Sequence, residues 1–139
     1  MAKIVVGVDG SGESQNALKW AVTHAKDGDE LRLVTTWSLQ ALAPLESPYP
    51  SRNEVEAAAG AILDDLVAAI PKMADGKELN VTTSIEYGHA GNALIENSAD
   101  ADLLVVGSRG YGGFKGLLLG SVSTYVVHHA TGPVVVVPT

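Results

Sequence analysis

A glycine-rich segment at residues 107–121 carries the clearest chemical signal in this chain. Two residues separate Gly107 from Gly110, nine separate Gly110 from Gly120, and Ser121 follows directly. Glycines adopt positive φ angles without steric cost and let a ligand approach the backbone closely. The segment lies between an apolar strand and the predicted start of a helix, where backbone N–H groups and the helix dipole favour an anion. The spacing therefore predicts a binding site for phosphate groups.

Two common phosphate-binding motifs do not fit the chain. Lys115 is followed by Gly116 in place of Ser or Thr, which disfavours a P-loop NTPase. The residues 10–12, Gly-Ser-Gly, lack the third glycine of a dinucleotide-binding fingerprint. The simplest alternative for 107–121 is a flexible connector. Binding is favoured over that alternative because the segment combines spaced glycines, a helix start and two cationic side chains, Arg109 and Lys115.

Asp9 is the acidic candidate for the same site, because it follows the first predicted strand. In doubly wound sheets, ligands bind beyond the carboxyl ends of the strands, where the winding reverses direction. If the first and fourth strands are neighbours, Asp9 lies close to the phosphates, where it could hold Mg²⁺ or accept from ribose hydroxyls. A carboxylate at this place can also simply cap the following turn. Asp9 alone leaves these roles open.

Strand-like and helix-like stretches alternate along the whole chain. The expected strands cover residues 3–8, 31–37, 79–87, 102–107 and 134–137, and the expected helices cover 13–26, 51–71, 92–99 and 121–130. Ser11 or Gly12 caps the first helix, and the proline-rich residues 38–50 are expected to form a loop that could act as a lid. The alternation predicts an α/β fold with one mainly parallel, doubly wound sheet and helices on both faces, in a single domain over residues 1–139.

The composition narrows the function classes. The chain has no cysteine, which excludes disulfides, thiolate metal sites and a cysteine nucleophile. With 9 Lys and Arg against 16 Asp and Glu, its formal charge of −7 argues against binding nucleic acid through a broad basic face. We expect no membrane contact and a cytoplasmic location, because neither a signal-peptide pattern nor a membrane-length apolar run occurs.

The four histidines give a weaker signal. His128 and His129 are adjacent, so on a helix their side chains point about 100° apart and do not form the i, i+4 pair that binds one metal ion. His89 stands in a glycine-flanked loop near the predicted site. We therefore expect no histidine metal site.

Several stretches outside the glycine-rich segment complete a recognisable pattern. The first strand ends in Val8-Asp9-Gly10-Ser11, residues 101–108 read Ala-Asp-Leu-Leu-Val-Val-Gly-Ser, and residues 132–138 read Gly-Pro-Val-Val-Val-Val-Pro. With the spacing Gly-x2-Gly-x9-Gly-Ser and Gly120-Ser121-Val122-Ser123, these stretches resemble the nucleotide-binding branch of the universal stress protein family. The resemblance spans nearly the whole chain.

This resemblance implies both a fold and a ligand. The fold would be Rossmann-like, similar to the adenine nucleotide alpha hydrolases, with five parallel strands in the order 3-2-1-4-5. ATP, or ADP or AMP, would bind at the ends of strands 1 and 4, and the chain would form a homodimer through Val134 to Val137. The matching positions imply these ligand contacts: Asp9 for ribose or metal, Thr36 for adenine, Gly107, Arg109 and Gly110 for ribose and phosphates, and Gly120, Ser121, Val122 and Ser123 for the phosphate tail.

The leading hypothesis is an ATP-binding sensor or switch in a stress response, because no convincing Ser-His-Asp or Cys-His set supports fast catalysis. Three alternatives stay open. One is a slow ATPase, with Asp9 holding Mg²⁺ and Arg109 near the terminal phosphate. Another is a regulator that binds AMP or cyclic AMP. The third is a partner-binding dimer that holds no nucleotide.

Overall fold

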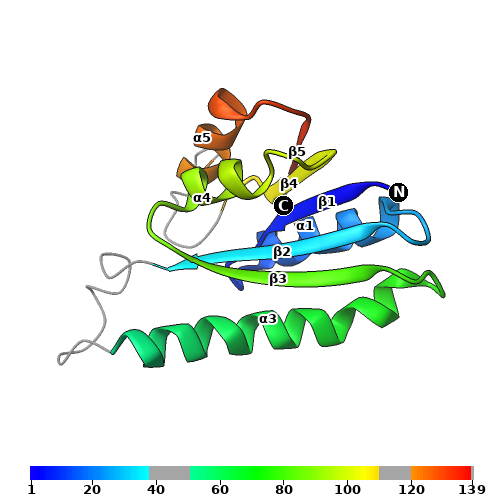
Figure 1. Cartoon of the computed structure of the whole chain (residues 1–139), viewed down its shortest axis with the longest axis horizontal. Helices are drawn as coiled ribbons and strands as arrows, with labels where there is room; N and C mark the ends of the chain where they lie inside the picture. Colours follow the sequence, from blue (N-terminus) through cyan, green and yellow to red (C-terminus); the bar gives the residue numbers. More distant parts are fainter. Residues whose placement is uncertain (38–50, 110–119, 139) are drawn as a thin grey trace.

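Five β-branched or apolar stretches form the strands of one sheet in the order β3-β2-β1-β4-β5 (Figure 1). These are β1 (Lys3–Gly7), β2 (Glu30–Trp37), β3 (Asn80–Tyr87), β4 (Leu103–Gly107) and β5 (Val134–Val137). All four pairings are parallel. The predicted sheet and its strand order are confirmed.

The computed structural model describes residues 1–37, 51–109 and 120–138. The predicted loop at 38–50 and the roles expected of Gly110 and Lys115 lie outside these residues.

Helices cover both faces of the sheet (Figure 1). They are α1 (Gly12–His24), α3 (Arg52–Ala74), α4 (Ala90–Asn97) and α5 (Ser121–His129). Successive side chains of a strand point to opposite faces, and β1 shows the consequence. Ile4 and Val6 join the core under α1 and α3, whereas Val5 joins the core under α4 and α5. A strand that is buried on both faces must be apolar along its buried part, as the residues Ile4, Val5 and Val6 of β1 are.

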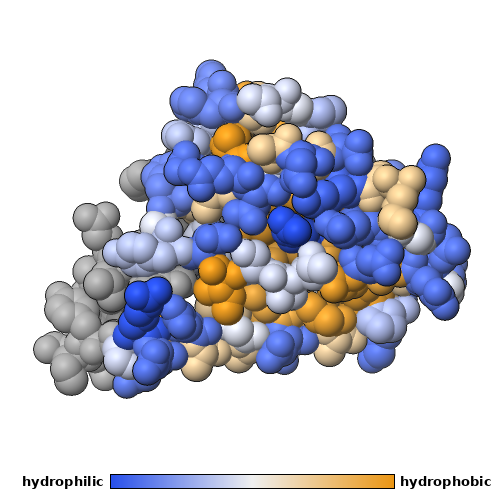
Figure 2. Space-filling view, in the orientation of Figure 1, coloured by the Kyte–Doolittle hydropathy of each residue, from blue (hydrophilic) through white to orange (hydrophobic). Residues whose placement is uncertain are grey.

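The surface is largely polar on the side that Figure 2 shows, with apolar residues visible in the band between β3 and α3. The edge strand β3 contributes the exposed residues Ile85 and Tyr87. Ile85 faces α3, because a Cβ added to Gly60 of that helix would lie 3.9 Å from its Cδ1 atom. The apolar band therefore follows the line where α3 packs against the edge of the sheet.

The helix α3 continues past Pro71, where the sequence predicted that it would end. Pro71 has no N–H, so it weakens the last turn locally. The turn still forms because Ile70 and Ala74 are buried in the core, and their packing outweighs one missing hydrogen bond. The helix ends at Asp75, which has a φ of 51°, in the left-handed conformation typical of a helix C-terminus.

Three other helix boundaries differ by two residues from the prediction, including the end of α4, which lies at Asn97 and was expected at residue 99. The helix α1 ends at His24, because the Nζ atom of Lys77 donates to the carbonyls of Val22, Thr23 and Ala25 at 2.6, 3.1 and 2.8 Å. The helix α4 begins at Ala90, because the Nδ1 atom of His89 accepts from the backbone N–H of Asn92, the third residue of the helix, at 3.1 Å. Neither partner has a local sequence signature.

Candidate functional site

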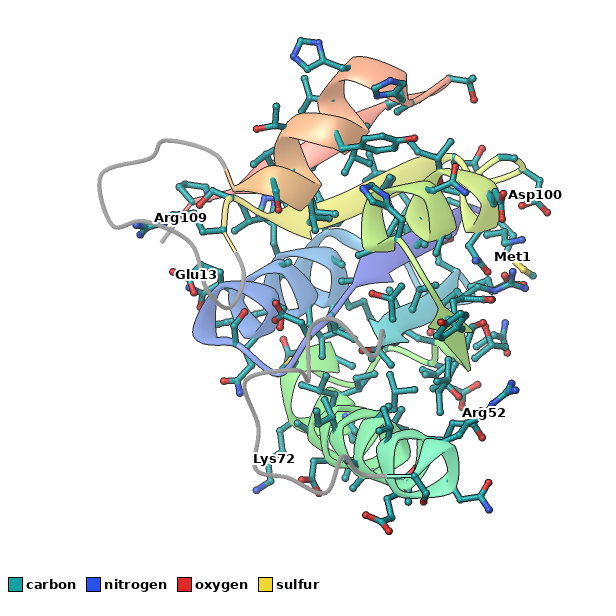
Figure 3. The ribbon with its side chains drawn as sticks, turned by 90° about the vertical axis from the view of Figure 1, so that its left-hand side faces the viewer. Met1, Glu13, Arg52, Lys72, Asp100 and Arg109 are labelled. Carbon is teal, nitrogen blue, oxygen red and sulfur yellow. The ribbon has the colours of Figure 1, made fainter. Side chains whose placement is uncertain are left out.

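The carboxyl ends of β1, β2 and β4 meet at one edge of the sheet, because these neighbouring strands are parallel. This edge gathers the turn at residues 9–12, Thr36, and residues 108–109. The pairing of β1 with β4 is the condition on which Asp9 was expected to approach the glycine-rich segment. Figure 3 looks onto this edge and shows Glu13 and Arg109 next to each other. The structure thus brings together the two segments that the sequence singled out.

The turn after β1 is held by its own side chains. The backbone N–H of Ser11 donates to Oδ1 of Asp9 at 2.9 Å, and Gly10 adopts a φ of 84°. The Ser11 side chain caps α1 by accepting from the N–H of Ser14, which confirms Ser11 over Gly12 as the cap. The Ser14 hydroxyl in turn accepts from the Asp9 N–H at 3.2 Å. Asp9 therefore performs the turn-capping role, and its contact with ribose or metal stays a prediction.

The start of α5 is fastened beneath the end of β4 by one carbonyl group. The carbonyl oxygen of Ser108 accepts from the N–H of Gly120 at 2.6 Å and from the hydroxyl of Ser123 at 2.7 Å. The N–H of Ser108 donates to the carbonyl of Val137 at 2.9 Å, which joins β5 to the same point. These bonds hold the first turn of α5 at the carboxyl edge of the sheet.

Gly120 caps α5 without a side-chain hydrogen bond. The first N–H groups of a helix have no partner inside the helix and attract anions. Ser121 stands exposed at this turn, while Val122 packs against the core beneath α4 and α5. The N–H of Gly120 is taken by the Ser108 carbonyl, so the backbone N–H groups of Ser121 and Val122 are the donors that this turn presents, whichever side chains these positions carry.

Two residues assigned to the ligand also have clear roles in the fold. Ser123 is buried, and its hydroxyl donates to the Ser108 carbonyl. A Cβ on Gly107 would lie 2.8 Å from the carbonyl oxygen of Glu13, closer than real Cβ atoms come to the backbone. Glycine at 107 thus lets the start of α1 pack on the end of β4. The ligand contacts expected of Gly107 and Ser123 remain predictions.

Arg109 faces an acidic residue that the motifs in the sequence did not single out. Its Nη2 atom lies 3.7 Å from Oε1 of Glu13, and the two side chains are 22% and 23% exposed. At this N–O distance, the pair contributes more to the local charge of the site than to the stability of the fold. The only sequence signal for Glu13 was its place in the first turn of α1, and Ser108 had none, because it acts through its carbonyl group.

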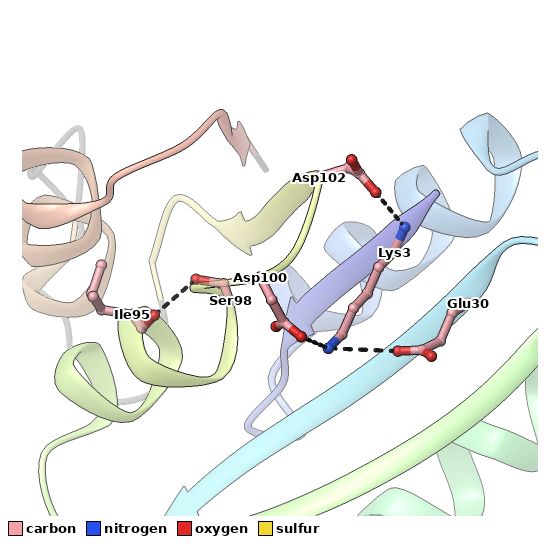
Figure 4. A network of polar contacts seen from close by, with 6 residues as sticks. All are labelled: Lys3, Glu30, Ile95, Ser98, Asp100 and Asp102. Atoms are coloured by element: carbon pink, nitrogen blue, oxygen red, sulfur yellow. Dashed lines mark hydrogen bonds and ion pairs between the residues drawn. The ribbon is translucent and has the colours of Figure 1, made fainter. Parts of the chain in front are cut away.

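Other charged groups form a separate network at the amino ends of the strands (Figure 4). The Nζ atom of Lys3 lies 2.8 Å from Asp100 and 3.9 Å from Glu30, and its backbone N–H donates to Asp102 at 2.8 Å. The hydrogen bond from Lys3 lowers the pKa of Asp100. The pKa of Asp29 is also lowered, chiefly by the backbone N–H groups of Lys26 and Ala2. Both shifted carboxyls lie away from the candidate site.

Two absences apply to the described part of the chain. Residues 1–37, 51–109 and 120–138 contain no group of three or more His, Cys, Asp or Glu residues that could hold a metal ion. None of the helices in the same ranges is both long enough and apolar enough to span a bilayer.

Comparison with known proteins gives one consistent family. The model of the universal stress protein family matches residues 1–138. A universal stress protein of Mycolicibacterium smegmatis is 33% identical over 149 aligned positions, covering 96% of this chain and 47% of the relative. The chain therefore spans about half the length of this curated relative.

Solved structures share the fold along almost the entire chain. A universal stress protein in complex with cAMP superposes with a TM-score of 0.69 at 26% identity, covering 98% of this chain and 95% of that one. A family member from Arabidopsis thaliana with AMP bound superposes with a TM-score of 0.68 at 20% identity, covering 99% and 92%. The second likeness supports the fold alone.

Proposed function

Since the chain belongs to the universal stress protein family, we propose that it binds an adenine nucleotide at the carboxyl edge of its sheet. In this proposal the nucleotide switches the protein between states in a cytoplasmic stress response, and fast catalysis plays no part. The complex of a structural neighbour with cAMP, at 26% identity, supports the ligand class.

The observation that carries the proposal is the anchored first turn of α5. The Ser108 carbonyl holds Gly120 and Ser123 in place, so the N–H groups of the first turn are oriented before any ligand arrives. Preorganised backbone donors at a helix N-terminus are well suited to phosphate oxygens, because binding then costs little reordering. Arg109 at the same edge adds a cationic partner.

The remaining assignments follow from position along the edge. Thr36, on β2, would offer backbone groups to adenine, and the Asp9 carboxylate, which also accepts from the N–H of Ser11, would accept from ribose hydroxyls. A magnesium ion, if one accompanies the phosphates, would take Asp9 as its protein ligand. Mg²⁺ commonly binds one or two carboxylates together with substrate phosphates and water, so a single carboxylate fits this arrangement.

AMP or cyclic AMP is the alternative ligand, and cyclic AMP has specific support because a structural neighbour at 26% identity binds it. Slow ATP hydrolysis and a nucleotide-free partner-binding dimer are the other candidates. These candidates differ in which ligand, if any, occupies the carboxyl ends of the strands. The identity of the bound ligand is therefore the first property to determine.

The primary experiment is to purify the protein without added nucleotide, denature it and identify the released ligand by liquid chromatography and mass spectrometry. Near-stoichiometric adenine nucleotide is the expected result. An empty protein that also gains no thermal stability from ATP, AMP or cyclic AMP would contradict the proposal, because ligand at about 100 times its dissociation constant should stabilise by roughly 2.7 kcal/mol.

The substitution Gly120→Asp tests the placement of the phosphates. Gly120 has a φ of −79° and a ψ of 177°, which other residues adopt readily, and Asp is a favoured N-cap residue, so α5 should form. The new carboxylate should weaken nucleotide binding by at least about 2 kcal/mol through like-charge repulsion, as measured by titration calorimetry. Gly120→Asn is the matched control with the same shape and no charge. Unchanged affinity in a folded Gly120→Asp variant would place the phosphates elsewhere.

A further inference from the structure

The candidate site carries an acidic residue where an anion is expected to bind. We infer that Glu13 is a specificity-determining residue, which makes the site favour adenine nucleotides of low phosphate charge, AMP and cyclic AMP, over free ATP. This inference rests on the proposed function, because it concerns the same site.

The backbone of Glu13 is packed against the end of β4, so it cannot move away from the site without disturbing that contact. A Cβ placed on Gly107 would meet the carbonyl oxygen, the carbonyl carbon and the Cβ of Glu13 at 2.8, 2.9 and 2.9 Å. The backbone of Glu13 therefore touches the strand end that leads into Ser108 and Arg109. Upstream, the Ser11 cap and the Asp9 carboxylate brace the start of the same helix. The fixed backbone limits the reach of the Glu13 carboxylate to the carboxyl ends of the strands, where it lies 3.7 Å from Arg109.

The carboxylate also competes for the cation. Oε1 of Glu13 lies 3.7 Å from Nη2 of Arg109, and each side chain is more than three-quarters buried. A phosphate that binds Arg109 must share the guanidinium with Glu13 or displace it. Two lysines of the described residues are engaged away from this site: Lys77 binds the carbonyls that end α1, and Lys3 pairs with Asp100.

The resulting repulsion grows with the charge of the ligand. Among the described residues of the site, Asp9 and Glu13 carry two negative charges against the one positive charge of Arg109, and the net charge of the whole chain is −7. Cyclic AMP carries about one negative charge at neutral pH, AMP about two and free ATP about four, and the Coulomb energy scales with this number. Glu13 should therefore disfavour free ATP most and cyclic AMP least.

The test compares the wild-type protein with Glu13→Gln, which removes the charge and keeps the shape of the side chain. Dissociation constants for ATP, AMP and cyclic AMP are measured by titration calorimetry at low ionic strength without divalent cations. We expect ATP to bind at least about tenfold more tightly to the variant, AMP by a smaller factor and cyclic AMP by less than about threefold. Glu13→Ala serves as a second variant if Glu13→Gln does not fold.

The matched control is Glu78→Gln. This exposed residue precedes β3 and lies at the amino ends of the strands, away from the site. The substitution therefore changes the net charge of the chain by the same amount and leaves the site intact. Three results would overturn the inference and leave the proposed function standing. In the first two, Glu13→Gln changes no affinity, or changes the affinities for all three nucleotides by one common factor. In the third, Glu78→Gln raises the affinities as much as Glu13→Gln does. If no nucleotide binds either protein, the proposed function fails and this inference fails with it.

Discussion

At the scale of single residues, the fold already uses several polar groups that the nucleotide-binding pattern assigns to a ligand. The Ser123 hydroxyl donates to the Ser108 carbonyl, and one oxygen of Asp9 accepts from the N–H of Ser11. These bonds position the edge of the sheet, because they orient the first turn of α5 and the start of α1. A variant at Ser123 should therefore affect binding through the orientation of α5 even if its side chain never touches the nucleotide.

Asp29 allows a prediction about pH at the residue scale. This buried carboxylate accepts from the backbone N–H groups of Ala2 and Lys26 at 2.9 and 2.8 Å, which lowers its pKa. Its unfolded pKa is near 3.9, so the stabilisation is complete above that pH and is lost as the pH falls through the lower folded pKa. Asp29→Asn should cost about 1–3 kcal/mol at pH 7, because an amide cannot accept from both donors with both of its atoms.

Urea unfolding between pH 7 and pH 2 measures this effect. The difference between Asp29→Asn and wild type should shrink below about pH 4. Asp65→Asn, at an exposed position of α3, is the control and should change little. A difference that is constant over the whole pH range would show that ionisation of Asp29 is not the source of its stabilisation.

At the scale of elements, the two helices on the second face make an unusually close approach. A Cβ added to Gly91 of α4 would lie 2.5 Å from the ring of Tyr125 on α5. The same ring contacts His89, which caps α4, at a centroid distance of 4.6 Å, and stacks on His129 at 4.1 Å. Ser123 fastens the start of α5 to the sheet. Farther along α5, Tyr125 packs against α4.

Two glycine substitutions should have opposite effects on stability. Gly91→Ala should destabilise by about 1–3 kcal/mol, because the new methyl group forces the Tyr125 ring to move. Gly60→Ala, inside α3, should stabilise by about 0.5–1 kcal/mol, since its Cβ meets Ile85 at an ordinary 3.9 Å and alanine favours the helix. Thermal or urea unfolding measures both. A Gly91→Ala variant as stable as wild type would show that α4 and α5 are not packed so closely.

At the scale of the whole molecule, the two outermost strands of the sheet differ in character. One outermost strand is the eight-residue β3, which contains the exposed residues Ile85 and Tyr87, and the other is the four-residue β5. In β5, Val134 to Val136 are half-buried and Val137 is buried, so the run of valines mostly serves the core. Its outer backbone groups still form an uncharged edge to which a second strand could add.

We predict a homodimer at micromolar concentration, paired through β5. The carbonyls of Pro133 and Val137 accept from β4, so alternation along the strand turns the N–H of Val136 outward. Val136→Pro removes that donor and should halve the mass measured by light scattering, whereas Val136→Ala keeps the donor and should remain dimeric. A wild-type protein that scatters as a stable monomer of 14.4 kDa would refute the prediction.

Much of the fold could be predicted because its determinants are local or periodic. The apolar run at 3–8 predicts a strand buried on both faces, and the spaced glycines and Gly120-Ser121 predict a helix start after β4. Helix boundaries were less predictable where the terminating partner comes from a distant part of the chain. Lys77 ends α1 from 52 residues beyond Ala25, and core packing of Ile70 and Ala74 carries α3 past Pro71.

The sequence by itself determined the fold class, the strand order through its family pattern, and that the turn after β1 and the start of α5 lie at the carboxyl ends of the strands. It did so because hydrophobic periodicity, helix caps and glycine spacing act over a few residues and leave a readable pattern. Only the tertiary structure decided that Ser123 faces the Ser108 carbonyl and that Glu13 lies against Arg109. Those contacts depend on how α1 and α5 are placed on neighbouring strands, and residues as distant in the chain as Glu13 and Arg109 meet only after the sheet has formed.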